Sequence, residues 1–328
     1  MNAPYLAAVC TALSGPASLK IEERTPEPLG KGEIRVAVKA AGLNFPDLLM
    51  TYGKYQFRPD PPFVPGLEVA GEIIETGDQT AGFAVGDRVM TGSKGGGFAE
   101  QIVVPAGAIK ILPPALSFAE GACWQTAAVT AWHALNDKAE LEPGQSILVL
   151  GASGGVGMSA VKLGKHKGAL VIGTASTEEK REVVLNAGAD YVLDPADPDL
   201  ARKVKDLTQG NGADAVFDPV GGELAKTATR AIAWGGRYLI VGFASGEIPS
   251  FTANHALIKG YSLMGLRAGE SARRNPALAA RNQAALHDLA EAGVMRPHIS
   301  HRYPLADAAE ALRILERREA VGRVAIEM

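Results

Sequence analysis

A glycine-rich run near the middle of the chain has the residue types and spacing to bind a pyrophosphate. It reads G-A-S-G-G-V-G from Gly151 to Gly157, after an apolar strand-like run and before a helical pattern. Such a turn brings the backbone close to the phosphates, whose charge then lies at a helix N-terminus. The residues predicted to bind a dinucleotide are Ala152, Ser153, Gly154, Gly155 and Val156. Because Ala152 replaces the first glycine of the usual pattern, a strand-to-helix turn without a ligand is the alternative.

The end of the next strand indicates which dinucleotide fits. An NAD site usually has an acidic residue there, about 20 residues after the glycine turn, to bind the ribose 2′-hydroxyl. Here residues 173–177 read G-T-A-S-T, without an acid, and Lys180 and Arg181 follow. A carboxylate would repel a 2′-phosphate, whereas hydroxyl donors and a cation would bind one. Ser176 and Lys180 are therefore predicted to bind NADPH. An exposed helix face is the alternative for the two basic residues.

The elements that position these residues alternate along the chain. From Ser146 to Val241 strand-like runs alternate with helical patterns, which predicts a parallel, doubly wound sheet. Before Ser117 the chain reads as strands and turns, and Glu33–Ala40 has the period-two alternation of a half-buried strand. The predicted strands are 33–40, 69–75, 87–90, 146–150, 170–174, 191–193, 213–218, 238–241, 262–266 and 323–326. The predicted helices are 156–167, 178–187, 200–208, 224–233, 275–292 and 306–318.

Composition excludes several classes of function. The formal net charge is -3 and the basic residues are scattered, which disfavours nucleic-acid binding. No apolar run approaches the ~20 residues of a membrane span. The two cysteines, Cys10 and Cys123, form no disulfide framework, and residues 1–19 lack the pattern of a signal peptide. We therefore expect a cytoplasmic protein that acts on a small molecule.

Several motifs together resemble the medium-chain dehydrogenase/reductase superfamily, and more narrowly its zinc-free quinone oxidoreductase branch, which includes zeta-crystallin. The motifs are A-A-G-L-N-F-P-D (40–47), P-G-L-E-V-A-G (65–71), V-G-D-R-V (85–89), A-A-V-T-A-W-H-A-L (127–135), the glycine turn, V-G-F-A-S-G (241–246) and N-H-A-L-I-K-G (254–260). The resemblance implies a β-rich GroES-like catalytic domain that is split in sequence by a Rossmann domain. We place the GroES-like domain at 1–122 and 264–328, and the Rossmann domain at 123–263. It also implies a homodimer that forms through the edge of the Rossmann sheet.

The positions that bind zinc in the zinc-dependent relatives carry other residue types here. Those relatives have a cysteine where Asn44 stands, a histidine where Leu67 stands and a third ligand near Thr126. None of these three residues supplies a thiolate, imidazole or carboxylate, so no metal is expected. Without a Lewis acid, ordinary alcohol dehydrogenation is disfavoured, and acceptors that take hydride readily are favoured.

The same resemblance assigns the remaining site residues. It predicts Asn44, Asp47 and Tyr55 as the catalytic residues. Asn44 and Asp47 correspond to a loop that faces the nicotinamide in relatives. Tyr55 resembles a pocket tyrosine that could donate a hydrogen bond or a proton to a developing oxyanion, with Tyr52 as an alternative. A packing or surface role is the other interpretation of Tyr55. The residues expected to contact the cofactor are Asn44, Thr130, Phe243, Ser245, Leu266, Arg267 and Arg323.

The function implied is reduction of quinones by NADPH, through direct hydride transfer without zinc. Reduction of 2-alkenals or enones uses the same geometry and stays open as an alternative. A non-catalytic NADPH-binding protein, structural or RNA-binding, is a third possibility. The chain departs from the pattern in two places: Asp194 and Pro195 stand where some relatives have a tyrosine for the 2′-phosphate, and Arg267 stands where they often have an aromatic residue.

Overall fold

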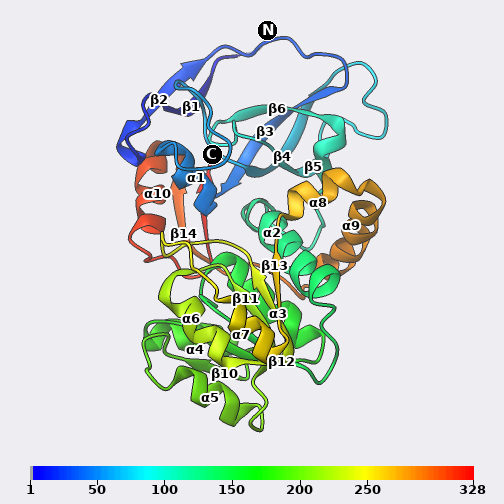
Figure 1. Ribbon diagram of the computed structural model, residues 1–328. Helices are drawn as coiled ribbons and strands as arrows, with labels where there is room; N and C mark the ends of the chain where they lie inside the picture. Colours follow the sequence, from blue (N-terminus) through cyan, green and yellow to red (C-terminus); the bar gives the residue numbers. More distant parts are fainter. Residues whose placement is uncertain (1–2) are drawn as a thin grey trace. The chain divides into compact units, whose positions relative to one another are not determined.

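The computed structural model describes residues 3–328, and the chain divides into two compact units. The first unit comprises Met1–Thr126 and Arg296–Met328, and the second comprises Ala127–Met295. In Figure 1 the first unit is blue to cyan and red, and the second runs from green to orange. The fold confirms the predicted class, a GroES-like β-rich unit joined to a Rossmann-like parallel sheet.

The first unit is built on a seven-stranded sheet in the order β14-β15-β3-β4-β5-β7, with β6 also paired to β3. Its strands are β3 (Glu33–Gly42), β4 (Glu68–Thr76), β5 (Arg88–Gly92), β6 (Gln101–Pro105), β7 (Ile109–Ile111), β14 (Ile299–Pro304) and β15 (Arg323–Glu327). A separate antiparallel pair consists of β1 (Tyr5–Cys10) and β2 (Leu19–Arg24). The helices are α1 (Phe45–Thr51), α10 (Ala308–Glu316) and the first part of α2 (Phe118–Trp132).

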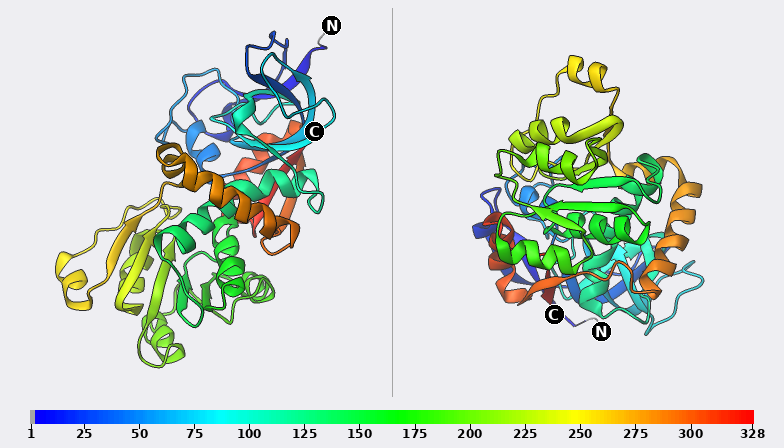
Figure 2. Two further views of the ribbon diagram at one scale, coloured as in Figure 1. Left: turned by 90° about the vertical axis from the view of Figure 1, so that its right-hand side faces the viewer. Right: turned by 90° about the horizontal axis from the view of Figure 1, so that it is seen from below.

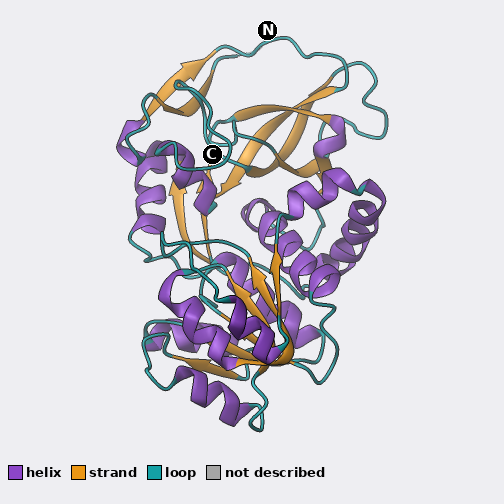
Figure 3. Ribbon diagram, viewed as in Figure 1, coloured by secondary structure: helices purple, strands orange, loops and turns teal. Residues whose placement is uncertain are grey.

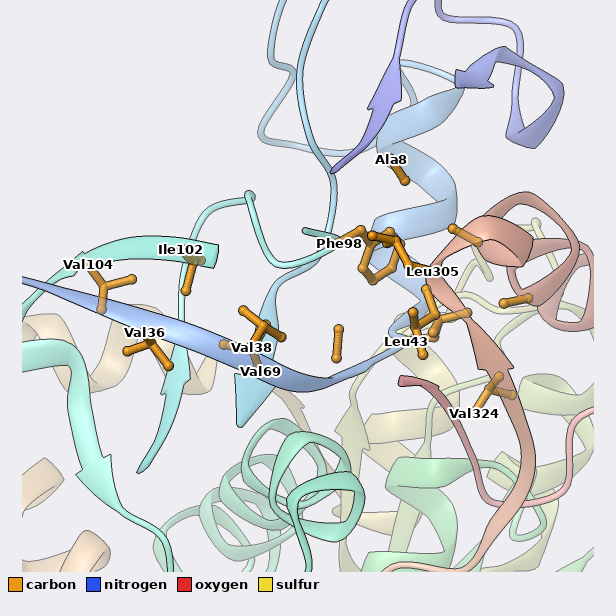
Figure 4. Packing of buried hydrophobic residues seen from close by; sticks show 14 of the residues in the cluster. Ala8, Val36, Val38, Leu43, Val69, Phe98, Ile102, Val104, Leu305 and Val324 are labelled. Carbon is orange, nitrogen blue, oxygen red and sulfur yellow. The ribbon is translucent and has the colours of Figure 1, made fainter. Parts of the chain in front are cut away.

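Apolar side chains of β3 form the centre of the first unit's core. Ile34, Val36 and Val38 are at most 2% exposed. The antiparallel register sets Ile34 opposite Val104 and Val36 opposite Ile102 of β6. Figure 4 shows the side chains of Val36, Val38, Ile102 and Val104 in this cluster. Each buried Val or Ile side chain stabilises the fold by about 1.5–3 kcal/mol, which explains why the alternating pattern fixes the register.

The second unit contains a six-stranded parallel sheet in the order β10-β9-β8-β11-β12-β13. Its strands are β8 (Ser146–Val149), β9 (Leu170–Thr174), β10 (Tyr191–Leu193), β11 (Ala213–Asp218), β12 (Ile232–Ile240) and β13 (Ser262–Gly265). Its main helices are α3 (Gly155–His166), α4 (Glu178–Asn186), α5 (Leu200–Leu207), α6 (Gly222–Ala231) and α7 (Ala253–Lys259), and they cover both faces of the sheet (Figures 2 and 3). The strand order reverses between β8 and β11, which is typical of a dinucleotide-binding sheet.

The chain returns to the first unit later than the sequence analysis places it. The second unit extends to Met295, beyond residue 263, and its first boundary lies after Thr126. It therefore includes α8 (Ala268–Arg274) and α9 (Pro276–Glu291). Asn282 of α9 donates a 2.7 Å hydrogen bond to Asp137, 145 residues earlier, which ties the helix to this unit. A contact at such separation leaves no local pattern in the sequence.

Every strand and helix that the sequence predicts is present, but the strands β1, β2, β6, β7 and β14 and the helices α1, α7 and α8 were not predicted. The strand β14 was not predicted, because I-S-H-R-Y-P lacks an apolar alternation. The strand β12 begins at Ile232 and not at 238, because a register shift lets Ile232 pair with Ala213 before the regular pairing starts. Within residues 3–328, no helix is both long enough and apolar enough to cross a membrane.

Replacing Phe98 by alanine is expected to destabilise the first unit. The Phe98 side chain is fully buried, so Phe98→Ala removes a large apolar group and leaves a cavity that costs about 3–5 kcal/mol. Urea unfolding followed by circular dichroism measures the loss. Val85→Ala is the control, because Val85 is 64% exposed and its truncation should change stability by less than about 0.5 kcal/mol. Equal losses in the two variants would contradict this account of the core.

Candidate active site

The glycine turn lies between β8 and α3, at the carboxyl edge of the parallel sheet. Gly151 has a φ of +56°, which favours glycine. Its N–H donates to Thr174 Oγ1 at 3.1 Å, and the N–H of Ala152 donates to Thr174 O at 2.9 Å. A Cβ at Gly157 would lie 2.4 Å from the Gly151 carbonyl oxygen. The end of β9 and two glycines therefore fix the shape of the turn.

The N-terminus of α3 is suited to an anion. Its N-cap, Gly154, has no side chain that could cap the first N–H groups, and Ser153, Gly155 and Val156 are partly exposed. Uncapped N–H groups at a helix N-terminus carry partial positive charge. The side chain of Ala152 is fully buried, so this residue can contribute only its backbone. These residues fit the phosphates of a dinucleotide.

Several other residues predicted to contact a cofactor come together at the same edge of the sheet. They follow the carboxyl ends of β9, β12 and β13, and they are Ser176, Phe243, Ser245, Leu266 and Arg267. Because all strands of this sheet are parallel, their ends share one edge with the glycine turn. Thr130 differs, because it lies within α2, where it is half-buried. Contact of these residues with a cofactor stays a prediction.

The residues predicted to recognise a 2′-phosphate lie around the start of α4. Ser176 is exposed, and Lys180 is half-buried in the first turn of the helix. Thr177 caps this turn by accepting a hydrogen bond from the backbone N–H of Lys180 at 3.2 Å. Arg181 reaches back to the strand end, where its Nη1 donates to Ala175 O at 3.2 Å. Hydroxyl groups and basic side chains therefore lie together next to the end of β9.

Asp218, which sequence reasoning missed, shapes the loop after β11. Its Oδ1 accepts hydrogen bonds from the N–H groups of Val220 and Gly221, each at 2.8 Å. Its Oδ2 accepts one from the Tyr238 hydroxyl at 2.7 Å. Burial raises the pKa of Asp218 and also that of Tyr238. The signal that could have found it is the run D-P-V-G-G after an apolar strand.

In the first unit, Asp47 connects two loops. One carboxylate oxygen accepts the N–H of Asn44 at 2.8 Å, and the other accepts the N–H of Gly66 at 3.1 Å. Asn44 is the N-cap of α1, and both Asn44 and Asp47 are buried. Burial raises the pKa of Asp47 to about 7, against the lowering effect of these two hydrogen bonds. The structure thus brings Asn44 and Asp47, two of the three predicted catalytic residues, into direct contact.

Arg323 fixes the amide of Asn44. Its Nη1 donates to Asn44 Oδ1 at 2.9 Å, and its Nη2 forms a buried ion pair with Glu68. The other oxygen of Glu68 accepts the backbone N–H of Thr126 at 2.7 Å. Burial raises the pKa of the neighbouring Cys123 thiol to about 11, so this cysteine is not a nucleophile at neutral pH. Contact of Arg323 with a cofactor stays a prediction. The observed hydrogen bond shows that Arg323 positions Asn44.

The two candidate tyrosines have different surroundings. The hydroxyl of Tyr52 donates to Glu316 Oε1 at 2.6 Å, and this hydrogen bond raises the pKa of Tyr52. Tyr55 is half-buried, and among the described residues no hydrogen-bond partner is found for its hydroxyl. Tyr55 therefore remains the better candidate for a donor to substrate.

Comparisons with known proteins agree with this architecture. A family model described as an alcohol dehydrogenase GroES-like domain matches residues 30–114, and one described as a zinc-binding dehydrogenase matches residues 155–283. A quinone oxidoreductase-like protein 2 homolog of Nematostella vectensis is 39% identical, over 98% of this chain and 88% of its own length. A quinone oxidoreductase of Sus scrofa is 32% identical over 94% of each chain. A mycobacterial structure in complex with NADPH has a TM-score of 0.91 and 30% identity, covering 99% of this chain and 100% of its own.

The stability conferred by Asp47 is expected to depend on pH. The pKa of its carboxyl is raised from 3.8 to about 7 in the folded chain, so the folded state holds a proton that the unfolded state releases between these values. Its contribution to the free energy of unfolding is fully present below about pH 4 and is lost as the pH rises through about 7. In Asp47→Asn the side chain does not titrate, so this pH-dependent contribution to the free energy of unfolding is absent. Urea unfolding from pH 5 to pH 8 should show the stability difference, wild type minus variant, falling by at most about 1.4 kcal/mol per pH unit. A difference that stays constant with pH would contradict the assignment.

Proposed function

Because the chain belongs to the medium-chain dehydrogenase/reductase superfamily, as a quinone oxidoreductase-like member, we propose that it reduces quinones with NADPH by direct hydride transfer, without zinc. The observation that carries the proposal is the glycine turn at the carboxyl edge of the six-stranded sheet, next to a strand end that has hydroxyls and bases in place of an acid. NADPH, when bound, supplies the hydride.

The second unit's part is to bind and orient the cofactor. The backbone of residues 153–156 receives the pyrophosphate at the N-terminus of α3, while Ser176 and Lys180 bind the 2′-phosphate. The rest of the cofactor contacts Phe243, Ser245, Leu266, Arg267 and Thr130. The N–H of Ser245 donates to Val220 O at 2.9 Å, so the loop that carries Phe243 and Ser245 is held in place.

The first unit's part is to position the acceptor. Asp47 and Arg323 hold the backbone and the amide of Asn44 in one orientation. This fixed orientation supports the proposed role of the Asn44 loop in facing the nicotinamide. The hydroxyl of Tyr55 donates a hydrogen bond to the acceptor oxygen and stabilises the negative charge that develops there when hydride arrives. A quinone or a conjugated carbonyl is the small-molecule partner that this chemistry suits.

We propose a reaction without zinc because of the residue types at the positions that bind zinc in the zinc-dependent relatives. Asn44 and Thr126 offer no soft or anionic side-chain ligand, and Glu68 is already engaged by Arg323 and by a backbone N–H. In the described part of the chain, no group of three or more His, Cys, Asp or Glu side chains is placed to hold a metal ion. A cytoplasmic location is also proposed, on the ground that both cysteines are buried and free.

Reduction of 2-alkenals or enones is the second candidate. Arg267 argues against a simple apolar quinone, because this exposed cation follows the end of β13 and an apolar acceptor would gain nothing from its charge. An acceptor with a polar or anionic substituent would gain an ion pair or a charge-assisted hydrogen bond there.

An assay of NADPH and NADH oxidation at 340 nm tests the proposal, with 1,4-benzoquinone, 9,10-phenanthrenequinone and 2-hexenal as acceptors and a simple alcohol with NADP as the reverse test. We expect NADPH loss with quinones, slower loss with NADH, and no reaction with the alcohol. Activity confined to 2-hexenal would favour the second candidate. Binding of NADPH without turnover of any acceptor would favour a non-catalytic role.

Replacing Tyr55 by phenylalanine is expected to lower kcat with quinones by roughly 10- to 100-fold, because one donor to the developing oxyanion is lost. Tyr52→Phe is the matched control: its hydroxyl already donates to Glu316, so kcat should change little. Equal effects of the two variants would remove Tyr55 from the proposed mechanism.

We also propose that the chain forms a homodimer through the edge strand β13 and the apolar surface beside it. Trp234, Leu257 and Ile258 are 78%, 80% and 65% exposed, an unusual surface for a monomer. Leu257→Glu should therefore shift sedimentation equilibrium from dimer to monomer. Val85→Glu, at an exposed apolar residue of the first unit, should leave the dimer intact. A monomeric wild-type protein would contradict the proposal.

A further inference from the structure

The end of β10 lies directly beside the loop proposed to hold the 2′-phosphate. The parallel register of β10 and β9 sets Leu193 opposite Thr174. The N–H of Ala175 extends this pairing by donating to Leu193 O at 3.1 Å. The next residue, Asp194, is thereby level with Ala175, and neighbouring strands are only about 4.8 Å apart. A carboxylate thus stands one strand away from Ser176.

Two contacts hold the Arg181 guanidinium over these strand ends. Its Nη1 donates to Ala175 O at 3.2 Å and lies 3.6 Å from Asp194 Oδ2. The other oxygen, Oδ1, accepts the N–H of Ala196 at 2.9 Å, so the turn after β10 orients the carboxylate. The side chains of Arg181 and Asp194 are 28% and 44% exposed, so solvent screens the pair.

We propose that Asp194 limits the preference of this chain for NADPH, because it competes with the 2′-phosphate for the Arg181 guanidinium. Arg181 is then a specificity-determining residue in addition to Lys180. The inference rests on the proposed function, since it requires the glycine turn to hold a dinucleotide.

The competition follows from the charges. A phosphate monoester carries more negative charge than a carboxylate, and the planar arginine fork binds it through two parallel hydrogen bonds. A half-exposed ion pair is weak enough for the phosphate to displace Asp194 from Arg181. The displaced carboxylate still lies within one strand spacing, where it repels the phosphate. NADH, with a 2′-hydroxyl, can bind while the Arg181–Asp194 pair stays intact.

The structure of the pair therefore predicts that the wild-type protein binds both dinucleotides, with a modest advantage for NADPH. In Asp194→Asn the guanidinium is released to the phosphate and a nearby negative charge is removed. The dissociation constant for NADPH should fall by about three- to tenfold, and that for NADH should stay within about twofold. In Arg181→Gln the dissociation constant for NADPH should rise by about tenfold or more, with little change for NADH.

Isothermal titration calorimetry without an acceptor measures these constants for the wild type, both single variants and the double variant. If Asp194 acts by holding Arg181, most of the gain from Asp194→Asn disappears when Arg181 is glutamine. A gain of the same size in both backgrounds, or weaker NADPH binding by Asp194→Asn, would overturn the proposal.

The matched control is Asp199→Asn. Asp199 pairs with Arg202 at 2.9 Å at the start of α5, with side chains 56% and 61% exposed, and this ion pair does not include Arg181. This variant should change the dissociation constant of neither NADPH nor NADH. An effect equal to that of Asp194→Asn would show that general surface charge is responsible, and it would overturn the proposal. If the wild-type protein bound neither dinucleotide, the proposed function itself would fail. That outcome is distinguishable from normal dinucleotide binding in which Asp194→Asn and Arg181→Gln have independent effects on the dissociation constant for NADPH.

Discussion

The buried ion pair between Arg323 and Glu68 is the interaction on which the first unit depends. Both residues are almost fully buried, and each isolated charge would cost several kcal/mol to remove from water. The pair is tolerated because Asn44 accepts a hydrogen bond from the arginine Nη1 and the second oxygen of the glutamate accepts the N–H of Thr126. Among the described residues, Arg323 Nε alone of these side-chain atoms has no hydrogen-bond partner. Strands β4 and β15, the loop before α1 and the middle of α2 therefore have to meet at one point. The orientation of Asn44 follows from this electrostatic requirement.

In the second unit the corresponding constraint is the parallel direction of the strands. It brings the ends of β8, β9, β11, β12 and β13 to one edge, although they are far apart in sequence. Backbone groups at that edge are satisfied by a few side chains, Thr174 for the glycine turn and Asp218 for the loop after β11. The sheet thus leaves the N-terminus of α3 as the place where an anion can be bound.

Local patterns predict most of this molecule, and contacts between distant residues account for what they miss. Alternation in β3 and the glycine turn at 151–157 are readable because each depends on neighbours in sequence. The partner of Asn44 is 279 residues away and that of Tyr52 is 264 residues away, so their orientations leave no sequence signal. The same holds for Arg181 and Asp194, which meet only because β9 and β10 are adjacent. The sequence alone therefore predicts candidate site residues, but it does not predict the interactions that hold them in place.

The position of β15 has a consequence for how the protein is made. This strand, formed by Arg323–Glu327, lies inside the first unit's sheet, between β14 and β3. All residues of the second unit, Ala127–Met295, are synthesised before it. On the ribosome the second unit can therefore complete its sheet while the first unit still lacks an interior strand, with the carboxylate of Glu68 and the edge of β3 unpaired. The first unit has to wait for residues 323–327 to be translated, so the part that is made first finishes folding last.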